Sequence, residues 1–181
     1  LYGEDAFQLS LQLTEEGVRF QSHLDGSRHL LSPERSMEAQ QNLGADIAMA
    51  FDECPPGASP KEAVAEATAR TTRWAERCLS AHTRKDQALC GIVPGGVHEA
   101  LRLQSARASV ARGFPGLAIG GVSVGEPPEE RSRVLDWLDP VLPVEKPRYL
   151  MGVGTPEDLI DGVARGVEYA QALDVVARPL V

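Results

Sequence analysis

Three short segments of this sequence combine residue types that can bind a small planar ligand. Asp52-Glu53-Cys54-Pro55 offers carboxylates, which accept hydrogen bonds only and suit a purine-like or guanidine-like edge with paired N–H donors. The segment 120–126 (GGVSVGE) begins with two glycines, next to which a ligand can approach the backbone closely. Met151-Gly152-Val153-Gly154 adds a polarizable sulfur that can pack on a flat ring.

Each segment also has a structural interpretation. Aspartate before prolines is common in turns, and methionine at a strand end often fills a core. The glycines of 120–125 do not form the Gly-x-Gly-x-x-Gly pattern of dinucleotide-binding proteins. The three segments indicate a site only if the fold brings them together.

Each of the three segments follows a run with the pattern of a buried parallel strand. Such apolar runs occur at 46–51, 88–93, 117–120, 148–152 and 172–176. Helical patterns cover 32–44, 59–82, 97–112, 129–138 and 155–166. Alternating strands and helices predict parallel βα units, and such folds place their chemistry at the carboxyl ends of the strands.

Local signals predict where the helices begin and end. Ser32 followed by Pro33 predicts a capped helix start, and Gly44 predicts its end. Ser59-Pro60-Lys61-Glu62 predicts a capping box at the start of the second helix. The buried stripe predicted for that helix is Ala63, Ala67, Thr71, Trp74, Cys78 and Ala81.

A hairpin pattern precedes the first helix. Extended runs flank Asp25-Gly26, which predicts a hairpin over 17–32 closed by a two-residue turn. Five parallel strands elsewhere fit either an open doubly wound sheet or part of a barrel. The 181 residues predict a single domain over 1–181. That length is too short for a whole (β/α)₈ barrel, which takes about 250 residues.

Composition narrows the function classes. The net charge is −8, whereas nucleic-acid-binding proteins more often carry a basic excess, so RNA binding by this segment alone is less expected. The sequence has neither an apolar run of roughly 20 residues nor a signal-peptide pattern, which predicts a cytoplasmic protein without membrane contact. The widely spaced Cys54, Cys78 and Cys90 argue against a disulfide framework and a metal site within the chain.

Together these segments resemble the tRNA-guanine transglycosylases, also called queuine tRNA-ribosyltransferases, over roughly residues 14–167. The longest matching motifs are Ala118-Ile-Gly-Gly-Val-Ser-Val-Gly-Glu126 and Lys146-Pro-Arg-Tyr-Leu-Met-Gly-Val-Gly-Thr-Pro-Glu-Asp-Leu159. Shorter ones are Phe51-Asp-Glu-Cys54, Thr72-Arg-Trp74 and Gly91-Ile-Val93. Motifs of this length in this order are far more specific than any single segment.

The resemblance implies an α/β fold that is a partial (β/α)₈ TIM-type barrel, namely its central part with the hairpin as an insertion. It implies a pentosyltransferase that exchanges guanine at the tRNA wobble position for a 7-deazaguanine in queuosine biosynthesis. The reaction passes through a covalent ribosyl–aspartate intermediate, and the target base leaves the stacked loop. The implied partners are tRNA and a guanine or 7-deazaguanine base. Val124 resembles the bacterial type, which takes preQ1.

The resemblance also implies a set of base-binding residues. They are Asp52, Cys54, Gly120, Gly121, Val122, Glu126, Tyr149 and Met151. Asp52 would hold the Watson–Crick edge, and Gly121 and Val122 would offer backbone contacts. Glu126 would fix the Val122 peptide and read the aminomethyl group of preQ1. The tyrosine and the methionine would flank the base.

Several positions differ from the family pattern. The family's catalytic aspartate falls on Gly3, with Asp5 nearby, and a base-binding glutamine is replaced by Pro94, which has no side-chain amide. Asp174 is the only candidate for the nucleophile, and only with a shifted alignment. The family's zinc-binding subdomain would lie beyond Val181, so we expect no metal or cofactor site in this chain.

Three hypotheses follow. The chain is a transglycosylase, a catalytically impaired homologue or fragment that binds a base or serves as a partner subunit, or a partial barrel without a site. Loss of a covalent nucleophile costs many orders of magnitude in rate, so the second and third fit the chain acting alone better. An incomplete barrel exposes strand edges, which predicts a homodimer or poor stability.

Overall fold

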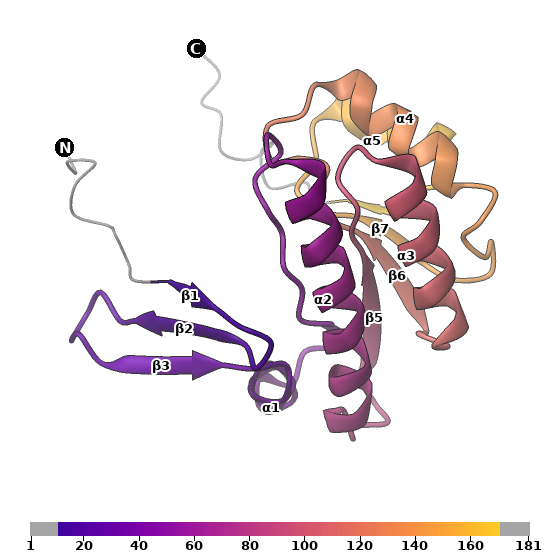
Figure 1. The fold of residues 1–181 in the computed structure, drawn as a ribbon. Coiled ribbons are helices and arrows are strands. Elements are labelled where there is room, and N and C mark those ends of the chain that lie inside the picture. The colour runs from indigo at the N-terminus through magenta and orange to yellow at the C-terminus, as the bar shows by residue number, and fades with distance from the viewer. Residues whose placement is uncertain (1–10, 171–181) are drawn as a thin grey trace, which may run out of the picture.

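The computed structural model describes residues 11–170 and contains two sheets (Figure 1). The first is antiparallel, with the order β1-β2-β3, over Gln12–Leu13, Val18–Gln21 and Arg28–Leu31. The second is parallel, with the order β4-β5-β6-β7-β8, over Ile47–Met49, Ala88–Val93, Gly116–Ile119, Arg148–Leu150 and Tyr169–Ala170.

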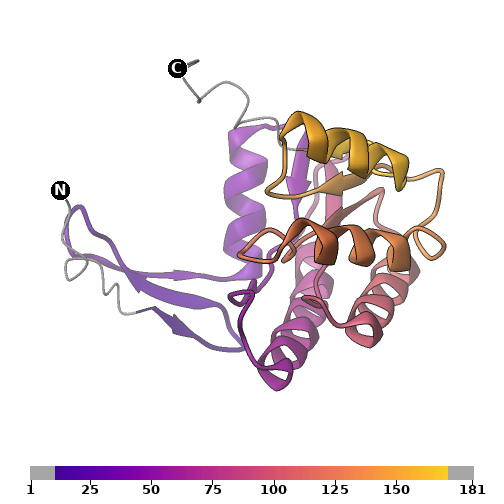
Figure 2. The same ribbon diagram turned by 90° about the horizontal axis from the view of Figure 1, so that it is seen from above.

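Five helices follow the outer side of the parallel sheet, the first just before β4 and the other four between its successive strands (Figure 2). They are α1 (Pro33–Leu43), α2 (Lys61–Ala81), α3 (Glu99–Ala111), α4 (Pro128–Leu138) and α5 (Pro156–Ala164). A doubly wound sheet reverses its strand order at a switch point and carries helices on both faces. Here the order is strictly sequential and the sheet curls, so the partial (β/α) barrel is confirmed and the doubly wound alternative is wrong.

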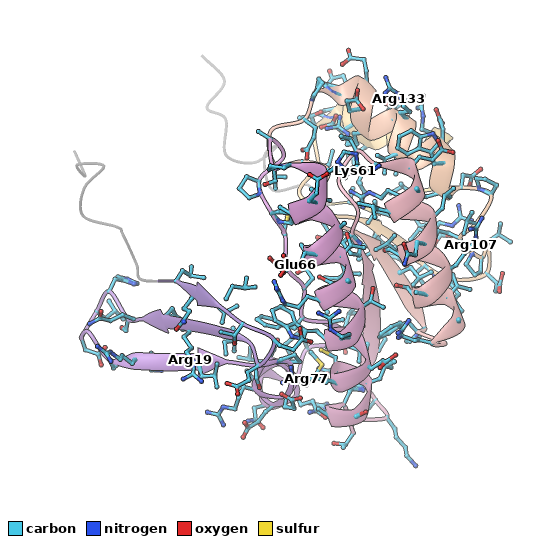
Figure 3. All side chains as sticks on the ribbon, viewed as in Figure 1. Arg19, Lys61, Glu66, Arg77, Arg107 and Arg133 are labelled. Atoms are coloured by element: carbon cyan, nitrogen blue, oxygen red, sulfur yellow. The ribbon has the colours of Figure 1, made fainter. Side chains whose placement is uncertain are left out.

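The core lies between the parallel sheet and these helices. Trp74 of α2 is fully buried and stacks on Phe51 with ring centroids 4.9 Å apart, as its place on the predicted stripe indicated. Its indole N–H donates to the carbonyl oxygen of Glu15 at 2.8 Å. Arg77, labelled in Figure 3, donates to the same carbonyl at 2.8 Å and to the Glu34 carboxylate. These bonds attach the turn between β1 and β2 to α2.

The predicted boundaries of α1 are confirmed, but the predicted capping box of α2 is wrong. Ser32 Oγ accepts from Arg35 N–H at 3.3 Å, and Gly44 ends α1 with a φ of 72°. At α2, Pro60 occupies the cap position and cannot cap through its side chain. Ser59 lies one residue too early and instead donates its N–H to the carbonyl of Pro56 at 2.9 Å.

The stripe of α2 is also shifted at its first turn. Ala63 is exposed and Val64 is buried in its place, whereas the later positions from Ala67 to Cys78 are buried as predicted. The first turn therefore faces the sheet one residue later than the spacing of the stripe predicts.

The predicted hairpin forms, but its two-residue turn is wrong. Ser22 N–H donates to the Ser27 carbonyl at 2.8 Å, so residues 23–26 form a four-residue loop. The Asp25 carboxylate accepts from the N–H of Ser27 at 3.1 Å and from its hydroxyl at 2.7 Å, which stabilises this wider loop. The sequence also missed β1, a two-residue strand paired with β2.

The parallel strands lie close to their predicted places. β5 has the predicted bounds, while β6 and β7 differ by one or two residues at an end. The strand predicted over 172–176 lies outside the described residues; β8 precedes it. Within residues 11–170, no helix has the length and apolar character that a membrane crossing requires.

Candidate functional site

The carboxyl ends of β4, β6 and β7 bring three of the predicted residues together. Asp52 follows β4, Gly120 follows β6 and Met151 follows β7. A Cβ atom at Gly120 would lie 3.7 Å from Asp52 Oδ2 and 3.5 Å from Met151 Sδ. The same Cβ would lie 2.9 Å from a methyl carbon of Ile92, so only glycine fits here. The three segments therefore meet at one edge of the sheet, as the strand pattern predicts.

Asp52 is the acidic residue at the edge of the sheet where the three segments meet. Burial raises the pKa of its carboxyl group to about 6; a backbone hydrogen bond opposes this shift, and the charge of Glu53 adds to it. Glu53 itself pairs with Arg70. A carboxyl group with a strongly raised pKa at the chemical end of a parallel sheet is a candidate for ligand recognition.

Cys54 and Gly121 lie beside this carboxyl group. A Cβ at Gly121, which has a φ of +64°, would lie 3.7 Å from Cys54 Sγ and 3.9 Å from Arg102 Nη2. Burial raises the pKa of the Cys54 thiol, as do the charges of Asp52 and Glu126, while Arg102 opposes them. The thiol is therefore protonated at neutral pH and is a poor nucleophile.

Glu126 joins the loop after β6 to the loop after β4. Its carboxylate accepts from the N–H of Val124 at 2.8 Å, two residues beyond the predicted Val122 peptide. A Cβ at Gly57 would lie 2.8 Å from Glu126 Oε1, so the β4 loop packs directly against this side chain. Val122 is fully buried, so its backbone becomes available to a ligand only when the surrounding loops separate.

The structure places Tyr149 in a different hollow from Asp52. Tyr149 lines a cavity of about 420 Å³ on the concave face of the sheet, together with Met49, Cys90 and Tyr169. The hollow lined by Asp52, Cys54, Pro94 and Gly121 measures only about 10 Å³, which is room for one water molecule. A base-sized ligand therefore requires these loops to separate, and contact between Tyr149 and a base stays a prediction.

Arg102 is a residue to which the sequence assigned no role. It lies on α3, is fully buried and contacts the loops after β5 and β6. Its helical neighbours Ser105 and Ala106 are also buried. An arginine on the small-residue face of α3 is the signal that points to it, because a buried guanidinium needs several acceptors.

The sequence was compared with known proteins. The profile of the family described as queuine tRNA-ribosyltransferase matches residues 1–172. The chain belongs to this family. The queuine tRNA-ribosyltransferase of Halothermothrix orenii is 58% identical over 168 residues, which are 92% of this chain and 45% of that protein. The bacterial character of the resemblance is confirmed.

Two further queuine tRNA-ribosyltransferases agree with this assignment. The protein of Desulforamulus reducens is 60% identical over 86% of this chain and 42% of its own length. The protein of Geobacillus kaustophilus is 55% identical over 92% of this chain and 44% of its own length. The chain thus spans less than half the length of these relatives.

The remaining family expectations fall partly outside the structure. Gly3, Asp5 and the candidate nucleophile Asp174 lie outside the described residues. Between residues 11 and 170, no three His, Cys, Asp or Glu side chains are placed to hold a metal ion.

Proposed function

We propose that this chain is the base-recognition part of a queuine tRNA-ribosyltransferase. It binds guanine or preQ1 for exchange at the wobble position of tRNA, which places it in the cytoplasm. The observation that carries the proposal is the convergence of Asp52, Gly120 and Met151 at one strand edge. Family membership gives this convergence its chemical meaning.

The proposed recognition follows from the chemistry of these groups. The Asp52 carboxylate accepts the paired N–H groups of the Watson–Crick edge. Once the loops separate, the ring lies where Asp52, Gly120 and Met151 meet, and the Met151 sulfur packs on its face. Glu126 carries the charge that attracts the aminomethyl group of preQ1. Entry of the ring displaces the β4 loop, since the hollow measures only about 10 Å³.

The proposed transfer step uses a carboxylate nucleophile, with Asp174 as its candidate. The carboxylate bonds to ribose C1′ while the C1′–N9 bond breaks, and guanine leaves with the electron pair and takes up a proton. The incoming base then loses a proton, attacks C1′ and releases the carboxylate. Asp174→Asn should reduce base exchange by more than about 10³-fold without changing guanine affinity. An unchanged exchange rate removes Asp174 from this role.

A second candidate function is a base-binding module or partner subunit that acts in a dimer. The exposed concave face favours it, because Ile47 of β4 and Tyr169 of β8 are 55% and 56% exposed. Strands with unpaired edges tend to pair with another chain. Sedimentation of the chain between micromolar and submillimolar concentration tests this candidate. A monomer at every concentration contradicts it.

Calorimetric titration with guanine and preQ1 tests the proposed function. Asp52→Ala should abolish saturable binding, whereas Asp86→Ala, which removes an exposed aspartate paired with Arg84, should leave the affinity unchanged. A chelator should have no effect, since we propose that recognition needs no metal from this chain. A folded wild-type chain that binds neither base contradicts the proposal. If binding is found, exchange of labelled guanine in tRNA measures the enzymatic activity.

A further inference from the structure

The guanidinium of Arg102 connects two loops of the candidate site. Its Nε donates to the carbonyl of Gly96 at 2.7 Å, and its Nη1 donates to those of Val93 at 2.6 Å and Gly120 at 2.7 Å. Its Nη2 donates to the carbonyl of Gly121 at 2.7 Å. Two of these carbonyls belong to the end of β5 and its loop, and two belong to the loop after β6. Arg102 therefore fixes these two loops relative to each other.

The surroundings of Arg102 are built to accept its side chain. Gly95 has a φ of +139°, and a Cβ there would lie 2.8 Å from the backbone nitrogen of Arg102 and 3.1 Å from its Cδ. Among the described residues, all the hydrogen-bond acceptors of this guanidinium are backbone carbonyls and none is a carboxylate. The charge of Glu126 acts on the guanidinium without bonding to it, so the cost of burying this cation is offset mainly by the four carbonyl groups.

Arg102 determines the direction in which the N–H groups of two glycine peptides point. In a trans peptide, the C=O and N–H groups point in opposite directions. Because Arg102 holds the carbonyls of Gly120 and Gly121, the N–H groups of Gly121 and Val122 point away from the guanidinium. Within residues 11–170 neither N–H has a protein acceptor. Gly121 also lines the hollow next to Asp52.

A carbonyl that accepts from a cation polarises its own peptide, and this strengthens the N–H donor of the same peptide. We propose that Arg102 is a positioning residue that orients and polarises the N–H groups of Gly121 and Val122 to bind an oxo group of the base. The inference rests on the proposed function. The ligand is the oxo-bearing purine or 7-deazapurine of that proposed function. This arrangement also favours a base that gains negative charge on that oxygen as it leaves the ribose.

The test compares two buried arginines and two purines. Arg102→Lys keeps the charge but cannot reach four carbonyls. Arg148→Lys is the matched control, since Arg148 is 4% exposed and bonds to Asp139 and Leu142 at the opposite end of the sheet. Guanine and 2-aminopurine, which lacks the oxo group and the N1–H next to it, are titrated into the wild type and both variants by calorimetry.

The inference predicts a selective loss. Arg102→Lys should weaken guanine binding roughly 10-fold or more while changing 2-aminopurine binding little, because the lost donors face only the oxo group. Arg148→Lys should change both affinities by less than about twofold. Equal loss for both purines, or no loss for guanine, contradicts the role of Arg102. Guanine binding that Asp52→Ala abolishes and Arg102→Lys leaves intact contradicts the inference but not the proposed function, whereas a wild type that binds neither purine contradicts both.

A measurement on the wild type applies if Arg102→Lys does not fold. The Nε–H signal of Arg102 in a ¹⁵N spectrum should shift when guanine is added and stay in place with 2-aminopurine. A signal that guanine leaves unmoved overturns the inference.

Discussion

The two ends of the parallel sheet use buried arginines in different ways. At the amino ends, Arg148 of β7 donates to the Asp139 carboxylate at 2.6 Å and to the carbonyl of Leu142. At the carboxyl ends, Arg102 donates to backbone carbonyls and burial lowers its pKa to about 9, with the charges of Glu126 and Cys54 opposing this shift. The first arrangement neutralises its charge, whereas the second keeps a positive charge beneath loops that carry candidate ligand groups.

The contrast extends to the acidic groups of the two ends. Asp139 is paired with Arg148 at the amino end, whereas Asp52 at the carboxyl end is buried with a raised pKa. Residues at the amino ends of barrel strands generally serve stability, and those at the carboxyl ends serve chemistry. The comparison therefore predicts that substitutions at the amino end lower stability and leave ligand affinity unchanged. Substitutions at the carboxyl end should lower ligand affinity without lowering stability.

At the amino end, replacing the buried arginine should lower stability. Arg148→Lys should lower the free energy of unfolding by roughly 1–3 kcal/mol, because lysine cannot replace the forked contacts to Asp139 and the nearby carbonyls. Urea unfolding measures this loss. Guanine affinity should stay unchanged in the folded protein. If Arg148→Lys also weakens guanine binding, the two ends do not differ in function as proposed.

At the carboxyl end, replacing Asp52 should increase stability at neutral pH. The folded pKa of Asp52, about 6, lies above its ordinary value of 3.8, so the wild type loses stability as pH rises between these values. Asp52→Asn cannot ionise. It should therefore be more stable than the wild type at pH 7 by an amount on the order of 1–3 kcal/mol, and equally stable below pH 3.8. Thermal unfolding from pH 3.5 to 8 tests this sign.

The smallest change in stability is expected for the helix cap of α1, which lies away from the candidate site. Ser32→Ala removes the hydroxyl that caps α1 and should cost about 1 kcal/mol of unfolding free energy. Guanine affinity should not change. The loss should be larger at neutral pH than at low pH, because the Ser32 hydroxyl donates to Glu34 Oε2 at 2.7 Å and so helps to lower the pKa of that carboxyl group. A loss that is the same at every pH would show that Ser32 acts through the cap alone.

The sequence predicted the features that depend on local pattern. The apolar run 88–93 gave the bounds of β5, and the Ser32-Pro33 signal gave the start of α1. The approach of Asp52 to Met151 followed from the rule that parallel strands share their carboxyl edge. These predictions succeeded because each depends on residues within one segment or on chain topology.

Features that depend on distant contacts were missed or misassigned. Arg102 acquires its acceptors from positions 93 to 121, and only the folded backbone brings them together. The turn before Ser27 widened because the Asp25 carboxylate bonds to that residue. The predicted capping box of α2 does not form because Pro60, not Ser59, occupies the cap position. These features depend on contacts between residues distant in the sequence or on side chains that compete for the same position. The spacing of residues shows neither.

Mapping of backbone amide shifts with guanine tests the central claim most directly. A uniformly ¹⁵N-labelled chain is titrated with guanine, and each amide signal is followed. The account predicts saturable shifts for Gly121, Val122 and the residues following Asp52, with the signals around Arg148 and Asp139 unmoved. Shifts confined to the amino ends of the strands, or spread without saturation over both ends, would contradict a base site at the carboxyl edge.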